Sequence, residues 1–335
     1  MRKLIWLIVI LAALYGGYWF AGARLLQSQL DGFVAAQQDA GRTAEFGTLK
    51  VQGFPSRFDV SAKDITLYDP QRSIGWSAPE ALVAALAYNP QHYIAVLPQQ
   101  QLVRLPGADI SISSADMRAS LVFATGPSFV LDRMVFVAKG LGVEAGAPQL
   151  RTGASELRLS TNRAEGSEFG HRIGFVADGL ILPQVLMDLL QNLPTELPAT
   201  VDRLHLDAVV DFDKRWDRHA LNGPLPQPTK ISLSDLSFTW GPIGLTLDAD
   251  LALDARGVPS GPMNLTIRGL KQMLDIAVAA GILPQQRRGM IEGAISLVAR
   301  PDAEGVITLA FQAKDSMLYL GPIGLTPLPS LHVYQ

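Results

Sequence analysis

Residues 245–255 read LTLDADLALDA, and this stretch decides the fold. Leucine and alanine occupy every second position, and threonine or aspartate stands between them except at Ala252. Successive side chains of a β-strand point to opposite faces, so a period of two predicts a strand with one apolar and one polar face. Strands of this kind are typical of antiparallel sheets in which one side is sheltered from water.

The same alternation recurs along the chain, and turn-forming segments such as 255–259 and 301–305 separate its copies. Further copies lie at 155–161, 202–212, 263–269 and 306–313. The fold class predicted is therefore mainly β (α+β), with long curved antiparallel sheets. Apolar segments without this alternation predict two or three short helices, at 180–190, at 270–282 and, as the third, at 78–86.

The N-terminus carries an uncharged stretch of 20 residues, 4–23, which is about the length needed to cross a bilayer. Arg2 and Lys3 precede it, so the positive-inside rule predicts a cytoplasmic N-terminus and an exported body in the periplasm. Tyr15, Tyr18, Trp19 and Phe20 gather at its far end, where aromatic rings prefer the headgroup layer.

A cleaved signal peptide is the alternative, because Ala21-Gly22-Ala23 fits the A-x-A cleavage pattern. The length of the apolar run and its bulky aromatic residues favour an uncleaved anchor over residues 1–24 instead. Both interpretations export residues 25–335. Residues 25–41 predict an amphipathic stalk helix, with Leu26, Leu30, Phe33 and Val34 on one side and Gly41 at its end.

One phrase occurs twice, as WGPIGLT at 240–246 and as LGPIGLT at 320–326. We interpret it as a structural element in which Gly241-Pro242 and Gly321-Pro322 form turns between strands. The repetition also predicts one elongated β-rich body over 42–335 with an internal duplication, about 42–200 and 201–335.

Composition excludes several classes of function. The formal net charge is −3 and no basic stretch occurs, so a nucleic-acid partner is not expected. The chain has no cysteine, which excludes disulfides, thiolate catalysis and cysteine-ligated metal centres. No serine-hydrolase elbow, zinc-binding histidine pair or nucleotide-binding loop is present. We therefore expect no catalytic residue and no cofactor.

The best cluster for metal chemistry is DFDKRWDRH at 211–219, whose Asp211, Asp213, Asp217 and His219 are weak candidate ligands. Arg215 and Trp216 stand where the calcium-loop pattern needs an oxygen donor and glycine. A solvated strand end with local Asp–Arg pairs is the simpler interpretation. A periplasmic hydrolase or metal-dependent enzyme stays as a remote alternative.

Several blocks, in this order, resemble the bacterial family called domain of unknown function 2125. They are VQGFPSRFDV (51–60), WSAPE (76–80), YNPQH (88–92), KRWDRHAL (214–221), TWG (239–241), DARGVPSGPMNLTIRG (254–269) and YLGPIGLTPLPSL (319–331). Glycine, proline and tryptophan dominate them, so they specify backbone shape rather than chemistry. More distantly, an anchor followed by amphipathic strands resembles the AsmA-like envelope proteins of Gram-negative bacteria, a family associated with outer-membrane lipid homeostasis.

These observations predict a non-catalytic envelope protein, held in the bacterial inner membrane by a single span, whose apolar strand faces contact lipid. The candidate lining residues are Leu204, Leu206, Val210, Leu245, Leu247, Leu251 and Leu253. The alternative for these side chains is an ordinary closed core against the helices at 180–190 and 270–282. The alternative function is a scaffold that binds another envelope protein through a sheet edge or through the turns.

Overall fold

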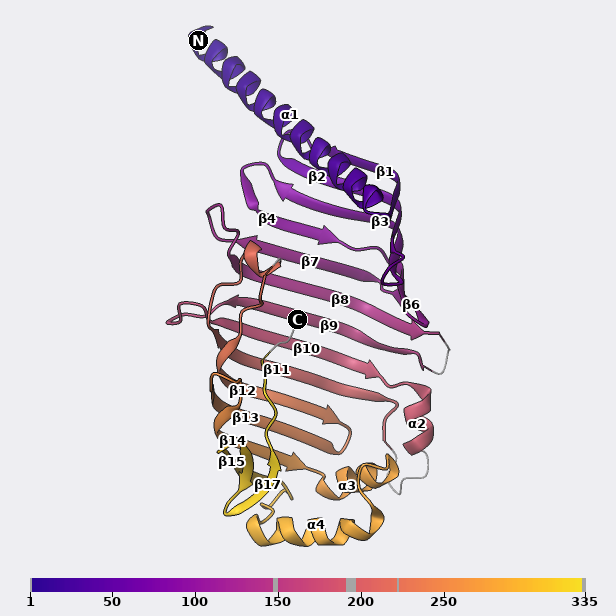
Figure 1. Ribbon diagram of the computed structural model, residues 1–335, viewed down its shortest axis with the longest axis vertical. Coiled ribbons are helices and arrows are strands. Elements are labelled where there is room, and N and C mark those ends of the chain that lie inside the picture. Colours follow the sequence, from indigo (N-terminus) through magenta and orange to yellow (C-terminus); the bar gives the residue numbers. More distant parts are fainter. Residues whose placement is uncertain (1, 147–149, 191–196, 222, 333–335) are drawn as a thin grey trace.

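One antiparallel sheet makes up most of the molecule (Figure 1). The computed structural model describes residues 2–146, 150–190, 197–221 and 223–332. Strands account for 52% of the protein and helices for 23%, which confirms the mainly β prediction. All seventeen strands of the described residues belong to this sheet, so it has no second sheet to pack against.

The strands of the first half are β1 (Thr43–Gln52), β2 (Arg57–Asp69), β3 (Ile74–Leu86), β4 (Asn89–Val96), β5 (Gln100–Leu105), β6 (Ala108–Ser113), β7 (Asp116–Phe123), β8 (Leu131–Ala145) and β9 (Thr152–Arg163). Those of the second half are β10 (His171–Ile181), β11 (Thr200–Phe212), β12 (Pro228–Trp240), β13 (Ile243–Leu253), β14 (Pro259–Arg268), β15 (Ile307–Lys314), β16 (Met317–Leu320) and β17 (Ile323–Pro327). The helices are α1 (Arg2–Asp39), α2 (Gln184–Leu190), α3 (Leu270–Ala279) and α4 (Gln285–Val298).

The sheet is a meander in which strands pair with their neighbours in sequence. The exception lies between β3 and β8, where each of two strand positions is filled by two short strands placed end to end. β3 pairs with both β4 and β5, and β8 pairs with both β6 and β7. β4 in turn pairs with β7, and β5 with β6. β4 and β5 are therefore two pieces of one long row, separated at Pro98, which has no N–H for a ladder hydrogen bond.

A crease runs across many of the strands at the level of these interruptions. At Asp64, Gly140 and Gly179 the backbone has φ of +50 to +58°. Each of these residues lacks a cross-strand partner, whereas the residues before and after it are paired in the same register. Residues of the apolar face that flank the crease are therefore three positions apart, as in Ala62 and Ile65, whereas in a regular strand they would be two apart. Such irregularities bend strands, and here they line up and bend the sheet.

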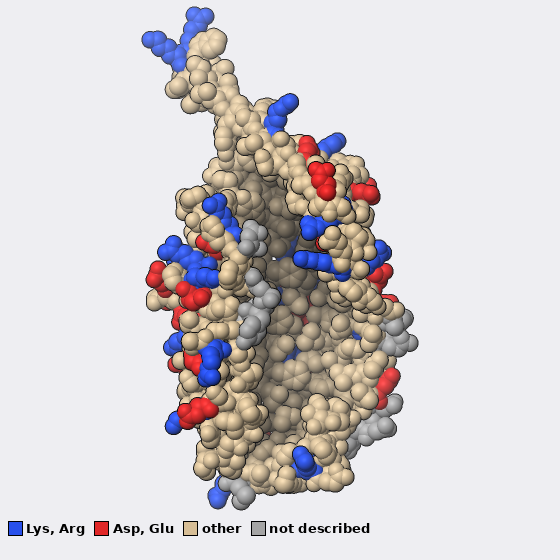
Figure 2. Space-filling model, in the orientation of Figure 1, with Lys and Arg blue, Asp and Glu red and all other residues tan. Residues whose placement is uncertain are grey.

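The bent sheet encloses a long hollow, which Figure 2 shows from its open side. The C-terminal segment after β17 passes in front of the strands in the same view. Its Leu328 packs against Ala249, Leu251 and Ala313, which are the apolar side chains of β13 and β15. The apolar face of the sheet therefore lines the hollow, and the polar face is the outer one.

Helix α1 covers the β1 edge of the sheet. The Gln27 side chain donates to the Leu49 carbonyl at 3.2 Å and accepts from the Val51 N–H at 3.1 Å, so it takes the place of a neighbouring strand. The helix is continuous from residue 2 to residue 39, where the expectation was an anchor followed by a separate stalk. It ends before Gly41, whose φ of +74° fits the predicted helix C-terminus.

The opposite end of the hollow is closed by packing against helices. Leu190 of α2 packs with Val201 and Trp240, and α3 contributes Ile276 to the same cluster. A second cluster joins Ile267, Ile307 and Leu309 to residues of α3 and α4. The helices thus cover the apolar face near β13–β15 and leave the middle of the sheet uncovered.

Both copies of the repeated phrase form β-hairpin turns, as predicted. Trp240 pairs with Ile243 and Leu320 pairs with Ile323, so Gly-Pro is the two-residue loop in each hairpin. Gly241 and Gly321 have φ of +53° and +57°. A positive φ followed by the fixed negative φ of proline is the sequence of a type II′ turn, one of the two favoured hairpin turns.

Two helix predictions need correction. The segment 78–86 lies in β3 and not in a helix, because it pairs with β2 along its length despite its helix-forming alanine and leucine. Pro79 is tolerated there because it falls at the unpaired level of the crease. The helix expected at 180–190 begins only at Gln184, since Leu180 and Ile181 still pair with β11. α4 was not predicted at all.

The two turn glycines give a matched test. A Cβ at Gly241 would lie 2.9 Å from Pro198 Cδ, whereas a Cβ at Gly321 meets nothing within 4 Å. We expect Gly321→Ala to destabilise the fold by about 1–3 kcal/mol through backbone strain alone. Gly241→Ala should lower the thermal unfolding midpoint further, because Pro198 must also move. Equal midpoints for the two variants would contradict this packing.

Candidate functional site

The candidate site is the apolar face that lines the hollow, which we call the trough. Its floor contains a row of residues that are direct cross-strand partners from β1 to β15. No polar residue interrupts the row, which consists of Val51, Val60, Val83, Ala95, Ala119, Phe136, Leu159, Phe175, Leu206, Leu236, Leu247, Leu265 and Leu309.

A second row runs beside the first, from Phe58 on β2 to Leu320 on β16, and only Tyr93 and Thr161 among its members carry a hydroxyl group. At a strand spacing of about 4.8 Å, the twelve steps of the first row measure about 58 Å along the sheet. That length is about twice the thickness of the hydrocarbon core of a bilayer. The trough is therefore long enough for a whole lipid.

The floor is only partly shielded from water. Phe136, Leu159, Phe175 and Leu206 are half-buried, and Val83 has 40% of its surface exposed. A filled sandwich would bury these side chains fully. In Figure 2 the hollow is lined mainly by uncharged residues, and charged side chains follow its two margins. An exposed apolar surface of this extent marks an interaction site in a folded protein.

The predicted lining residues all lie on the trough face, but in two environments. Leu204, Leu206, Val210, Leu247 and Leu253 are partly exposed. Leu251 is buried with Leu328 of the C-terminal segment, and Leu245 packs in the cluster of Ile267 beneath α3. The open-groove interpretation thus describes the first set, and the closed-core alternative describes these last two.

Sequence reasoning missed the part of the floor that lies on β2–β10. There apolar residues stand on both faces: Val135 and Val137 alternate with Phe136 and Ala138 of the floor. The alternation with aspartate that reveals β13 is therefore absent. The crease also shifts the apolar period by one residue, which disguises long strands as shorter ones.

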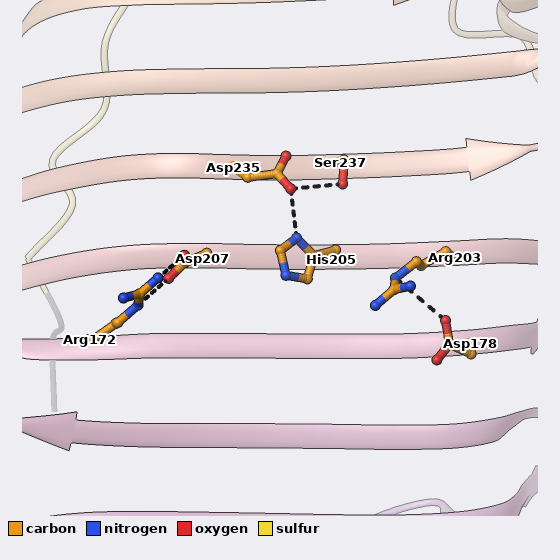
Figure 3. A network of polar contacts seen from close by, with 7 residues as sticks. All are labelled: Arg172, Asp178, Arg203, His205, Asp207, Asp235 and Ser237. Atoms are coloured by element: carbon orange, nitrogen blue, oxygen red, sulfur yellow. Dashed lines mark hydrogen bonds and ion pairs between the residues drawn. The ribbon is translucent and has the colours of Figure 1, made fainter.

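The outer face carries a ladder of charged pairs, part of which is shown in Figure 3. Arg172 forms a bidentate pair with Asp207, and this hydrogen-bonded partner holds the pKa of the Asp207 carboxyl below its usual range. Arg203 lies 3.6 Å from Asp178 on the neighbouring strand. These exposed pairs are cross-strand neighbours that help to fix the register.

His205, Asp235 and Ser237 lie together on this face and superficially resemble a catalytic triad (Figure 3). His205 Nδ1 is 2.7 Å from Asp235 Oδ2, but the Ser237 hydroxyl donates to the same carboxylate at 3.3 Å and not to the histidine. A serine is activated by a hydrogen bond to the base. The arrangement orients His205 and Asp235 without generating a nucleophile.

The weak metal candidates are not brought together. No group of three or more metal-ligating side chains occurs within the described ranges. Asp213 accepts from the Gln227 N–H, which joins two segments, and Asp217 accepts from the His219 N–H within a local turn, each at 2.8 Å. Asp217 and His219 line a depression of about 810 Å³ that also contains Lys214, Arg215 and Arg218. Its excess of cations suits an anion better than a metal ion.

The comparisons with known proteins identify one family. No curated protein and no solved structure matches the chain. The profile of the bacterial family described as "Uncharacterized protein conserved in bacteria (DUF2125)" matches residues 19–329. That range begins at Trp19, within the part of α1 that contacts the body, and includes every strand of the trough. The chain therefore belongs to the DUF2125 family of bacterial proteins.

Proposed function

We propose that this protein is a membrane-anchored envelope protein whose trough binds the acyl chains of lipids. The observation that carries the proposal is the unbroken apolar row of the floor, partly exposed and directly continued by α1. Trp19 and Ala23 of α1 form a buried cluster with Ala87. Val51 and Phe58, the first members of the two rows, pack against this cluster. An apolar path thus runs from the N-terminal helix onto the floor.

The energetics favour an acyl chain over water in such a groove. Burial of a methylene group is worth about 0.8 kcal/mol. A groove that covers roughly half of a 16-carbon chain would contribute about 6 kcal/mol on that scale. The polar headgroup would stay at the margins, where the charged side chains lie. A soluble polar substrate would gain nothing from the floor.

The N-terminal helix supports the envelope location. It is the one helix among the described residues that is long and apolar enough to span a membrane, with a mean hydropathy of 2.0 over its best window. Arg2 and Lys3 precede the apolar stretch, which favours a cytoplasmic N-terminus and a trough on the exported side. A signal peptide passes the same test, so the intact mass of the purified protein distinguishes the two.

Adjacent residues of β10 provide the test of lipid binding. Phe175 belongs to the floor, and Val176 points to the outer face between the partners Arg158 and His205. We expect Phe175→Asp to lose the phospholipid that co-purifies with the full-length protein, because a carboxylate would be desolvated beneath an acyl chain. Mass spectrometry of the extracted lipids gives the amount per protein.

Val176→Asp introduces the same charge one residue away and should retain the lipid, since Arg158 and His205 can pair with the new carboxylate. Circular dichroism and the unfolding midpoint of both variants establish that the sheet is intact. Lipid retained by Phe175→Asp, or absent from the unmodified protein, would reject the proposal.

A second candidate function is strand addition by another envelope protein at β17. One edge of the sheet is covered by α1, but β17 pairs only with β16 among the described strands. Its five residues are all exposed, including Ile323 at 52% and Leu325 at 47%. An uncovered edge strand with apolar side chains is a ready template for a partner strand.

This candidate predicts that a photo-crosslinking residue at position 323 captures one protein partner in cells. Replacing Leu325 by Lys in the same chain should abolish that product, because charge on an edge strand opposes pairing. The lipid content of the Leu325→Lys variant should stay unchanged. Absence of any discrete crosslinked product from position 323 would argue against strand addition.

A further inference from the structure

The position of the body relative to the bilayer follows from the length of α1. We propose that the turns between β1 and β2 and between β3 and β4 lie in the outer leaflet of the membrane that α1 spans. The end of the trough that is formed by β1–β3 would then be in contact with lipid. This inference rests on the proposed role of α1 as a membrane anchor, and it adds a bilayer-contacting surface on the body itself.

The free part of α1 is too short to cross the bilayer alone. Contact with the body begins at Tyr15, whose hydroxyl donates to the Pro55 carbonyl at 2.9 Å. The thirteen residues 2–14 that precede it span about 20 Å at 1.5 Å per residue. The hydrocarbon core measures about 30 Å. Roughly 10 Å of the span must therefore come from the segment that carries the body, and tilting the helix increases this deficit.

That segment and the two turns form an aromatic collar, which consists of Tyr15, Tyr18, Trp19, Phe20, Phe54, Phe58 and Tyr88. Trp19 stacks on Phe58 with ring centroids 5.6 Å apart, and Phe20 stacks on Phe54 at 5.3 Å. The outward members are strongly exposed: Phe20 at 62%, Phe54 at 53% and Tyr88 at 72%. Exposed aromatic rings of this kind are typical of the membrane interface.

Backbone carbonyls of the collar are hydrogen-bonded, as a low-dielectric environment requires, because an unsatisfied carbonyl there costs several kcal/mol. Aromatic side chains of α1 donate to three carbonyls at the collar: Tyr15 to Pro55, Tyr18 to Ala87 and Trp19 to Arg57, at 2.9, 3.1 and 2.7 Å. The Gly53 and Ser56 carbonyls accept from the N–H groups of Arg57 and Ala87. Pro55 has no N–H to desolvate.

The charge pattern points the same way. Residues 53–56 and 87–88, which form the two turns, contain no charged side chain. The turn between β2 and β3, at the other ends of the same strands, contains Arg72. Successive turns of an antiparallel meander lie on opposite margins of the sheet. One margin is therefore suited to lipid and the other to water.

Seating the collar in the leaflet would place the first floor residues beside acyl chains. Val51 and Phe58 pack against the cluster that contains Trp19 of the collar. A lipid could then move from the leaflet onto the floor without exposing its chains to water. The exposed rings of the collar would be covered by the bilayer instead of standing in solvent.

Site-specific fluorescence quenching tests the proposal, and the absence of cysteine from the chain makes each label unique. The environment-sensitive fluorophore NBD is attached to the full-length protein at Ser56→Cys or Tyr88→Cys, and the protein is reconstituted into phosphatidylethanolamine–phosphatidylglycerol liposomes. We expect a blue-shifted emission that doxyl-labelled phospholipids quench. The control Gln71→Cys, in the turn between β2 and β3, should show neither effect, and Leu11→Cys, within the span, should show both.

Unquenched labels at positions 56 and 88 beside a quenched label at position 11 would overturn the seating of the body. That result would not decide whether the trough binds lipid, which the Phe175→Asp measurement tests separately. An unquenched label at position 11 would overturn the seating as well, because it removes the membrane span on which the inference rests. Quenching at position 71 as strong as at position 88 would also contradict it.

Discussion

The structure depends on one constraint, which is the cross-strand register that keeps an apolar residue on the same face of each strand from β1 to β15. A slip of one residue in any ladder would move the apolar side chains of that strand to the outer face. The strand β12 shows how closely the register is kept. Ile231 and Leu233 are odd-numbered and Leu236 and Phe238 even-numbered, yet a bulge at Ser234–Asp235 brings all four to the trough. Charged pairs such as Arg172–Asp207 fix the same register from outside.

A single sheet with one apolar face cannot hide that face by itself, and the fold covers it only at its ends. α1 lies on the first strands, while α2, α3, α4 and the C-terminal segment cover the last ones. The largest fully buried side chains of the described residues are Ile243, Ile267, Val201 and Pro226, and none of them lies in the middle of the sheet. The middle strands of the sheet must therefore be stabilised by strand pairing and by side-chain contacts along the rows, and their apolar face stays uncovered in the folded protein.

Much of this architecture could be predicted from the sequence, and the failures have physical causes. The stretch 245–255 reveals its strand because aspartate marks the outer face, and Gly-Pro specifies the hairpin turns by its backbone angles. The segment 78–86 was wrongly predicted as a helix because strand pairing overrides the helix propensity of alanine and leucine. α4 was not predicted because Gly289 and Gly293 weaken the helical periodicity of its sequence. The floor between β2 and β10 was missed because Val135 and Val137 stand on the outer face. Whether an apolar face is open or covered is set by long-range packing, which periodicity does not report.

The most direct measurement of the central claim is a photo-crosslinking series along β10 in living cells, with a photoreactive amino acid placed in turn at positions 173, 174, 175 and 176. Ile173 and Phe175 belong to the floor, and the two residues that alternate with them lie on the outer face. The account predicts phospholipid adducts with a period of two, present at positions 173 and 175 and absent at 174 and 176. Adducts at all four positions or at none would contradict an open apolar trough that holds lipid.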